Sequence, residues 1–270
     1  MKLSDYHHLL KPRSKQSHKG DFGHVLIVGG GIGFSGAPRL AAMAAARVGA
    51  GLITIATHPN HSALMTMTRP ELMSHPVETD QQLQALINKA TVIAVGPGLG
   101  VSDWARLLLA TVLRQSKPMI IDADGLNLIA RQPARHYDHA ILTPHPGEAA
   151  RLLDCTTERI QADRQQAIQQ LWQRYQAVTV LKGANTLVID EQERVNTCED
   201  GNPGMASGGM GDLLTGVIAG LVAQGLSLGD AANCGVCLHA RAGDLAAAEK
   251  GQRGLLATDL LAYIQKLVNP

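Results

Sequence analysis

The chain has 270 residues, of which 45% are hydrophobic and 17% are charged, so a disordered protein is excluded and one large domain with a sizeable core is expected. Aromatic residues make up only 3% of the chain. The core must therefore be filled by aliphatic side chains, as in helices layered on a sheet. The 24 basic and 23 acidic residues leave a net charge of +1, which argues against a nucleic acid bound through its phosphates.

The N-terminal segment, residues 1–19, contains no apolar run of the kind that forms a secretory signal. Its basic residues Lys11, Arg13, Lys15 and Lys19 predict a solvated arm. Four cysteines are too few for a disulfide scaffold in a chain of this size. We therefore expect a cytoplasmic protein.

Apolar runs rich in valine and isoleucine alternate with helical patterns, which is typical of an α/β fold with a mostly parallel sheet and helices on both faces. The predicted strands are His24–Val28, Leu52–Ala56, Val92–Val95, Met119–Asp122, Ala140–Thr143, Val178–Leu181 and Thr186–Ile189. Between the earlier strands, alanine-rich patterns predict helices such as Arg39–Val48 and Trp104–Arg114.

After Asp212 the strand pattern ends, and two or more helices are expected to complete the chain. The longest uncharged stretch, Leu213–Gly229, contains glycines and falls short of the roughly 20 apolar residues of a membrane span. It therefore predicts a buried helix, and no membrane is expected as a partner. No repeat, linker or charge block marks a boundary, so residues 1–270 are expected to form a single domain.

Function in open α/β sheets gathers in the loops that follow the carboxyl ends of the strands. In this chain those loops are rich in glycine and in ionisable residues; in chain order they read GGGIGFSGA, GPGLG, DADGLN, TPHPGE and KGANT. Because parallel strands end at the same edge of a sheet, these segments predict an active site along one edge.

The segment Asn202–Asp212 carries the strongest pattern, because several glycines precede an apolar helix. Glycine lets backbone N–H groups turn inward and approach a phosphate closely, and a helix N-terminus adds the positive end of its dipole. Asp212 on the first turn is then placed to take a proton from an attacking hydroxyl. A plain carboxylate at a helix start would explain Asp212 but not the glycines. We therefore predict an anion hole with Asp212 as the catalytic base.

The run Gly31–Gly36 spells GxGxxG after a strand, and it could bind a dinucleotide. A Rossmann site also needs an acidic residue at the end of the second strand to hold the ribose. Here that strand is followed by Thr57, His58 and Pro59. We interpret the loop as a substrate contact, with an NAD(P) hydride cofactor as the alternative.

His145 lies between two prolines at a strand end, where a functional role is favoured over a structural one. Glu148, at the start of the next helix, is either a first-turn carboxylate or a residue that holds Mg²⁺ through water; the residues do not separate these. Lys182 is either part of a plain hairpin turn or a charge placed for a nucleotide's phosphates or ribose. Asp122 and Asp124 follow another buried strand and could orient neighbouring loops.

The pair Cys234 and Cys237 forms a CxxC pattern inside a helical run. No second pair accompanies it, and His239 is one residue too far along for haem attachment. Buried thiols are the favoured interpretation, and no zinc or iron is expected.

Taken together, SHKGDFGHVLIVGG, GFSGA, GPGLG, DADGLN, TPHPGEAARLL, VLKGANT and NPGMASGGMGD resemble the ADP-dependent NAD(P)H-hydrate dehydratases. These belong to the ribokinase-like superfamily. The resemblance runs from about Lys11 to the C-terminus. GGMGD alone indicates only the superfamily, whereas HKGDFG, TPHPGE and KGANT point to the dehydratases.

The resemblance implies dehydration of (6S)-NADHX or NADPHX to NADH or NADPH, with ADP as co-substrate converted to AMP and phosphate, and with Mg²⁺. The residues that match the family's hydrate contacts are Ala37, Gly100, His145 and Asp212. Those expected to hold the adenine nucleotide are Lys182, Gly183, Ala184, Asn185 and Thr186, together with Gly208, Gly209 and Gly211. A homo-oligomer is also expected. The epimerase domain fused to many relatives is not expected here.

Two alternatives stay open at this point. A small-molecule kinase of the same superfamily would use the same Asp212 and anion hole on a stable alcohol. A non-catalytic NAD(P)-binding sensor would use the GxGxxG loop but leave Asp212 without a purpose.

Overall fold

The computed structural model describes residues 1–269, and its centre is a nine-stranded sheet in the order β3-β2-β1-β4-β5-β6-β7-β8-β9. Strands β1 to β7 are parallel, while β8 and β9 are antiparallel to their neighbours. The strands are β1 His24–Val28, β2 Leu52–Thr57, β3 Met73–Pro76, β4 Val92–Val95, β5 Met119–Ile121, β6 Ala140–Leu142, β7 Val178–Leu181, β8 Thr186–Ile189 and β9 Val195–Cys198.

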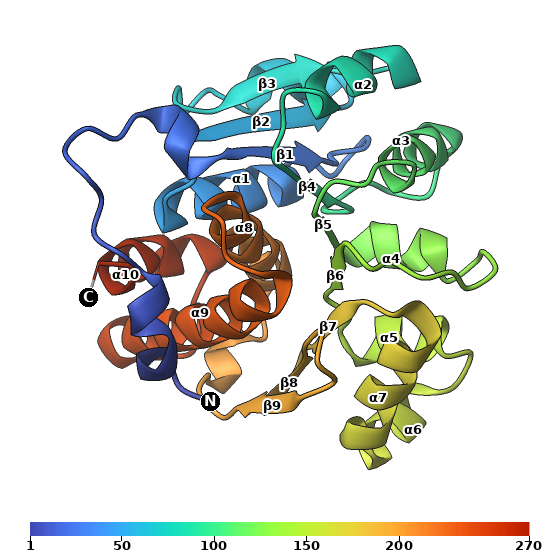
Figure 1. The fold of residues 1–270 in the computed structure, drawn as a ribbon, viewed down its shortest axis with the longest axis vertical. Coiled ribbons are helices and arrows are strands. Elements are labelled where there is room, and N and C mark those ends of the chain that lie inside the picture. The colour runs from blue at the N-terminus through green and yellow to red at the C-terminus, as the bar shows by residue number, and fades with distance from the viewer. Residues whose placement is uncertain (270) are drawn as a thin grey trace.

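Helices cover both faces of the sheet (Figure 1). One face carries α1 Gly36–Val48, α8 Met210–Ala223, α9 Leu228–Lys250 and α10 Leu260–Leu267. The other carries α2 Asp80–Ile87, α3 Asp103–Leu113, α4 Ala123–Ile129, α5 Pro146–Leu152, α6 Thr157–Ala162 and α7 Arg164–Tyr175. The predicted α/β class with a mostly parallel sheet is therefore confirmed.

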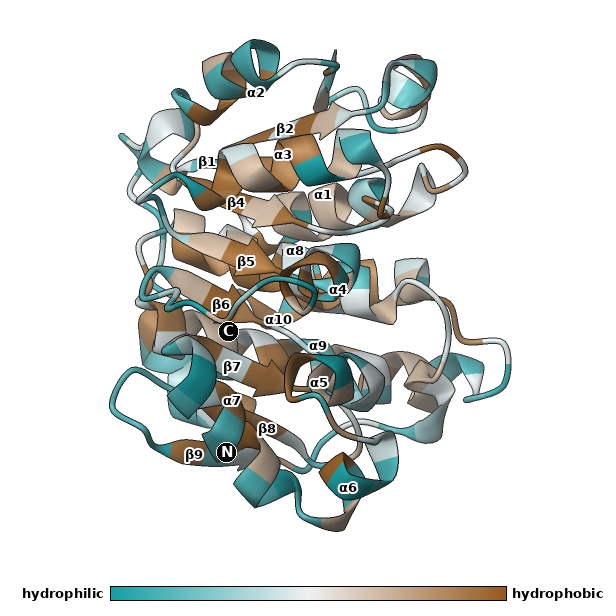
Figure 2. Cartoon of the chain, turned by 90° about the vertical axis from the view of Figure 1, so that its right-hand side faces the viewer, coloured by the Kyte–Doolittle hydropathy of each residue, from teal (hydrophilic) through white to brown (hydrophobic). Residues whose placement is uncertain are grey.

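A hydrophobic core lies on each face of the sheet, because successive side chains of a strand point to opposite faces. In β1, Val25 and Ile27 pack toward α1 and α8, while Leu26 and Val28 pack toward the opposite layer. Because both faces are covered, every other residue can be apolar as well, and the strands become continuous hydrophobic runs. Figure 2 shows the central strands as hydrophobic and much of the helical surface as hydrophilic.

All seven predicted strands are present, with ends that differ by at most one residue. The sequence missed β3 and β9, which form the two edges of the sheet. Except for the buried Cys198, their residues are partly buried or exposed, and β3 ends in Pro76, which cannot donate to a ladder. Edge strands lack the apolar run that identified the others.

The N-terminal residues pack against the domain more than the sequence suggested. The 3₁₀ helix Leu3–Leu9 contacts α9, and Leu3 is buried. Arg13 stacks on the ring of Phe22 with 3.6 Å between its guanidinium carbon and the ring centre, and it hydrogen-bonds to Gly49 O. Arg13 is nevertheless exposed, as expected for a solvated residue, while its planar cation contacts both an aromatic face and a carbonyl acceptor.

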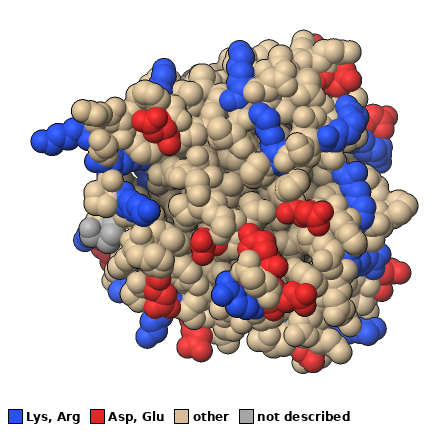
Figure 3. All heavy atoms as spheres, viewed as in Figure 1, with Lys and Arg blue, Asp and Glu red and all other residues tan. Residues whose placement is uncertain are grey.

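The distribution of surface charge and the hydropathy of the helices bear on the expectation that neither a nucleic acid nor a membrane is a partner. Basic and acidic residues are interspersed over the face in Figure 3, and neither sign covers it continuously. Within residues 1–269, no helix is both long enough and apolar enough to cross a membrane. The stretch that begins at Leu213 is buried in α8, as predicted.

Candidate active site

The loops after β1 and β4 lie against each other where the strand order reverses. The N–H of Gly31 donates to Gly98 O at 2.7 Å, and that of Gly30 donates to Pro97 O at 3.2 Å. A Cβ on Gly29 would lie 2.0 Å from Pro97 O, so glycine is required for this close approach. A reversal point of this kind is where open α/β sheets bind ligands.

Ala37 and Gly100 border this reversal point. A Cβ built on Gly98 would lie 3.1 Å from the Cβ of Ala37, so the two loops are in contact. The N–H of Gly100 donates to Asp124 Oδ2 at 2.8 Å, and Asp124 also accepts from Asn127 at 3.2 Å. Asp124 thus holds the loop after β4, the orienting role that the sequence left open for it.

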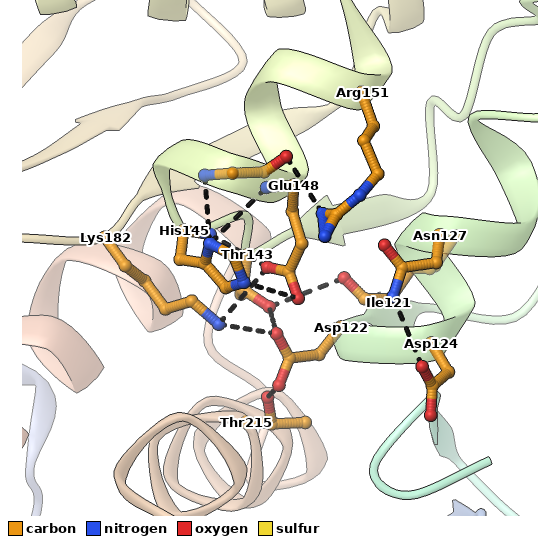
Figure 4. Close-up of polar contacts among 11 residues, drawn as sticks. Ile121, Asp122, Asp124, Asn127, Thr143, His145, Glu148, Arg151, Lys182 and Thr215 are labelled. Carbon is orange, nitrogen blue, oxygen red and sulfur yellow. Dashed lines mark hydrogen bonds and ion pairs between the residues drawn. The ribbon is translucent and has the colours of Figure 1, made fainter. Parts of the chain in front are cut away.

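Asp122 is the centre of a buried polar network at the end of β5 (Figure 4). Its side chain is 1% exposed. Oδ1 accepts from Thr143 Oγ1 at 2.7 Å and from Lys182 Nζ at 2.8 Å, while Oδ2 accepts from Thr215 Oγ1 at 2.8 Å. The network thereby ties β5, β6, the loop after β7, and α8 to one carboxylate.

Lys182 points inward from the end of β7, toward carboxylates. Its Nζ lies 2.8 Å from Asp122 Oδ1 and 3.8 Å from Glu148 Oε2. Burial acts to lower the pKa of Lys182, but the charges of Asp122, Glu148 and Asp212 outweigh burial and hold that pKa above its usual value. The ammonium is therefore a fixed internal cation.

His145 and Glu148 form a capping box at the start of α5. His145 Nδ1 accepts from the N–H of Gly147 at 3.0 Å, and Glu148 Oε2 accepts from the N–H of His145 at 2.8 Å. Burial raises the pKa of Glu148 to about 7, although Lys182 opposes the shift. Burial and the charges of Lys182 and Arg151 lower the pKa of His145, so its half-exposed ring is neutral near pH 7.

The glycine-rich segment before α8 leads directly into the buried network around Asp122 and Lys182. Gly209 has φ 91° and forms the N-cap, so Asp212 lies on the first turn of the helix, as predicted. A Cβ on Gly211 would lie 3.2 Å from Lys182 Nζ. The α8 N-terminus and the internal ammonium therefore concentrate positive charge at one point.

Asp212, on the first turn of α8, is a candidate for proton transfer. Burial raises its pKa to about 7, the charge of Asp122 adds to this rise, and Lys182 opposes it. A base with a pKa near the working pH combines a large ionised fraction with a useful proton affinity.

The loop between β7 and β8 is held by hydrogen bonds at its base, while its tip is exposed to solvent. Arg164 donates to Leu181 O at 3.0 Å, and Thr186 Oγ1 donates to Gly183 O at 2.8 Å. Asn185 has φ 54°, which its short polar side chain tolerates. Gly183 and Ala184 are exposed, so the backbone of this loop is accessible to a ligand.

Thr143 and Thr215 are functional candidates that were not predicted from the sequence, although Thr143 is the first residue of the TPHPGE segment. Each donates its hydroxyl to Asp122. Position was the available signal: Thr143 directly follows β6, and Thr215 lies three residues after Asp212 on the same face of α8. Cys234 and Cys237 are buried on α9, as predicted, and no cluster of three metal-binding side chains occurs in residues 1–269.

Comparison with known sequences gives the same assignment as the motifs. A family model described as NAD(P)H-hydrate dehydratase matches residues 25–266. The bifunctional NAD(P)H-hydrate repair enzyme Nnr of Coxiella burnetii is 55% identical over 262 residues, which cover 97% of this chain and 54% of that protein. The chain spans about half the length of the curated relatives it matches.

Solved structures agree with the sequence comparison. The ADP/ATP-dependent NAD(P)H-hydrate dehydratase from Bacillus subtilis, co-crystallised with ATP and Mg²⁺, is similar with a TM-score of 0.89 and 30% identity, covering 98% of this chain and 95% of that one. A ribokinase-like superfamily protein from Enterococcus faecalis has a TM-score of 0.87 and 28% identity, with the same coverage. The chain therefore belongs to the NAD(P)H-hydrate dehydratase family and has a ribokinase-like fold.

Proposed function

We propose that this chain dehydrates (6S)-NADHX and (6S)-NADPHX to NADH and NADPH, while ADP is converted to AMP and phosphate. The observation that carries the proposal is Asp212, whose pKa is raised to about 7 on the first turn of a helix that opens with glycines. A base beside an anion hole suits transfer of a phosphoryl group to a hydroxyl. The ADP dependence is supported by the Bacillus subtilis relative, described as ADP/ATP-dependent.

In this mechanism Asp212 takes the proton of the ring hydroxyl as that oxygen attacks the β-phosphorus of ADP, and AMP leaves. The glycine-rich N-terminus of α8 stabilises the charge on the transferring group. The phosphorylated oxygen is then a good leaving group, and the lone pair of the ring nitrogen helps to expel phosphate. Loss of a proton from the adjacent ring carbon completes the reduced nicotinamide.

The nucleotide is held by two loops in this proposal. Gly208, Gly209 and Gly211 offer backbone N–H groups to the phosphates. The exposed segment from Lys182 to Thr186 holds the rest of ADP through its main chain, because the Lys182 ammonium already faces Asp122 and Glu148.

Mg²⁺ fits this site only as a hydrated ion carried by the nucleotide. The internal ammonium of Lys182 takes the place between Asp122 and Glu148 where a bare cation would otherwise lie. Mg²⁺ commonly keeps several waters and binds through substrate phosphates, so Glu148 would contact it through water. When bound, the ion would neutralise phosphate charge.

The hydrate is proposed to lie at the reversal point beside β1 and β4. Ala37 and Gly100 border that point, and His145, with a half-exposed ring at the start of α5, is proposed to contact the hydrate from the end of β6. A homo-oligomer and a cytoplasmic location remain part of the proposal, and light scattering tests the first of these.

The direct test is incubation with hydrated NADH and ADP, followed by absorbance of the reduced nicotinamide. We expect reduced cofactor, AMP and phosphate in equal amounts, and no ADP consumption without the hydrate. A stable phosphorylated product, or ADP use with simple alcohols but not with the hydrate, would instead support a small-molecule kinase.

A further inference from the structure

The loop that precedes α8 is fixed to α9 by an aspartate with no role in the site described above. Asp244 Oδ2 accepts from the N–H of Gly201 at 3.0 Å, and its Oδ1 accepts from Asn202 Nδ2 at 2.9 Å. Asn202 Oδ1 in turn accepts from the N–H of Gly204 at 3.0 Å. Two hydrogen bonds thus connect the beginning of the glycine-rich loop to Asp244 on α9, and a third, within the loop, joins Asn202 to Gly204.

Further contacts along the same loop lead to the helix start. A Cβ on Gly243 would lie 2.4 Å from Met205 Sδ, so this glycine makes room for the methionine against α9. His239 is buried on α9, and its ring lies near the backbone of Met210, the first residue of α8. His239 and Gly243 are four residues apart, and they therefore share one face of α9. The 3₁₀ helix Pro203–Met205 within this loop contacts α9, and α8 and α9 lie side by side in Figure 1.

We propose that Asp244 and Asn202 are a positioning pair that presets the glycine-rich loop for the phosphates of the nucleotide. Glycine-rich segments lose much conformational entropy when they order. A loop fixed before the ligand arrives avoids that cost at the moment of binding. The inference rests on the proposed binding of ADP, and it assigns to Asp244 an effect on nucleotide affinity through Gly201 and Asn202.

The pair offers a matched exchange because its donors and acceptors are reciprocal. In Asp244→Asn, one oxygen can still accept, but the new amide faces a second donor. In Asn202→Asp, two carboxylates face each other. With both changes together, the carboxylate introduced at position 202 accepts from the N–H of Gly204. The amide introduced at position 244 donates to that carboxylate and accepts from the N–H of Gly201. All three hydrogen bonds are restored, and the negative charge moves from position 244 to position 202.

The experiment measures ADP affinity by calorimetry and the melting temperature of four proteins: wild type, the two single variants and the double exchange. We expect each single change to raise the ADP dissociation constant roughly tenfold, the cost of one charge-assisted hydrogen bond. The kcat at saturating ADP should change little, and the double exchange should return affinity toward wild type. Glu191→Gln is the control, because Glu191 accepts from the N–H of Gly229 at the opposite end of α9; it should leave ADP affinity unchanged.

Single variants that melt earlier but bind ADP as the wild type does would overturn the proposal, as would a folded double variant with no recovery. Hydrogen exchange of the amides from Gly204 to Gly211 in ligand-free protein provides a second measure. Unchanged exchange in Asp244→Asn contradicts the positioning role by itself. A wild type that binds no ADP would refute the proposed function instead.

Discussion

Asp122 and Asp212 are both near Lys182, yet the protein treats the two carboxylates in opposite ways. Asp122 is 1% exposed and accepts hydrogen bonds from Thr143, Thr215 and Lys182. Asp212 is half-buried beside the same ammonium, and burial dominates its environment and raises its pKa to about 7. A carboxylate whose oxygens accept several hydrogen bonds holds neighbouring elements together, whereas a carboxylate whose charge is disfavoured by burial is a candidate for proton transfer.

The largest effect that this comparison predicts is on turnover. Asp212→Asn should lower kcat roughly 10²–10⁴-fold, because the amide cannot accept the proton of the hydroxyl. Folding and ADP affinity should be retained, as measured by circular dichroism and calorimetry. Asp230→Asn, on the first turn of α9 and far from the loops described here, is the matched control. Near wild-type turnover in Asp212→Asn would contradict the role of this residue.

Stability should separate the two aspartates in the opposite sense. Asp122→Ala leaves the Lys182 ammonium and two hydroxyls without their shared partner and should lower the free energy of unfolding by about 3–5 kcal/mol. Asp212→Ala should cause little loss, because the native structure disfavours its charge. Urea unfolding at pH 8 measures both variants. Equal losses would mean that Asp212 is also a structural residue.

Two glycines on either side of Met210 test whether the loop binds phosphate or only folds. Gly209→Ala should weaken ADP binding and lower stability, because φ is 91° and a Cβ would lie 2.5 Å from Leu40 Cδ1. Gly211→Val should crowd Lys182 from 3.2 Å and reduce affinity. Gly208→Ala should leave stability unchanged, since no atom lies within 4 Å of its added Cβ. A loss of ADP affinity in this variant would therefore report on phosphate binding and not on folding. Calorimetric titration with ADP that gives wild-type affinity for all three would place the phosphates elsewhere.

The sequence could predict what is local and repetitive in this molecule. Continuous apolar runs predicted the buried strands, and the glycines before Asp212 predicted the start of α8, because both signals lie within a few consecutive residues. The edge strands β3 and β9 were missed because burial on one side only leaves no such run.

The arrangement of the site could not be predicted, because it depends on contacts between distant parts of the chain. Lys182 meets Asp122 across 60 positions, and Thr215 meets Asp122 across 93. From sequence, Lys182 looked free to contact a phosphate, whereas in the fold its ammonium faces two carboxylates. Asp244 and Asn202 are 42 positions apart and belong to no motif as a pair.

The smallest predicted effect is on pH dependence, and it sharpens the contrast between the two aspartates. Asp212 must be ionised to accept a proton, so kcat should rise with pH and level off above about 7, its raised pKa. The free energy of unfolding should change with pH in the opposite direction. The folded state holds the proton of Asp212 more tightly than the unfolded chain does. The stabilisation from Asp212 is therefore fully present below its ordinary pKa and is lost as pH rises through about 7. Glu148, also raised to about 7, should act on stability in the same direction. Rates and unfolding measured from pH 5 to 9 should therefore change in opposite directions, and the stability change should shrink in Asp212→Asn. A kcat that falls across this range would assign the base to a different group.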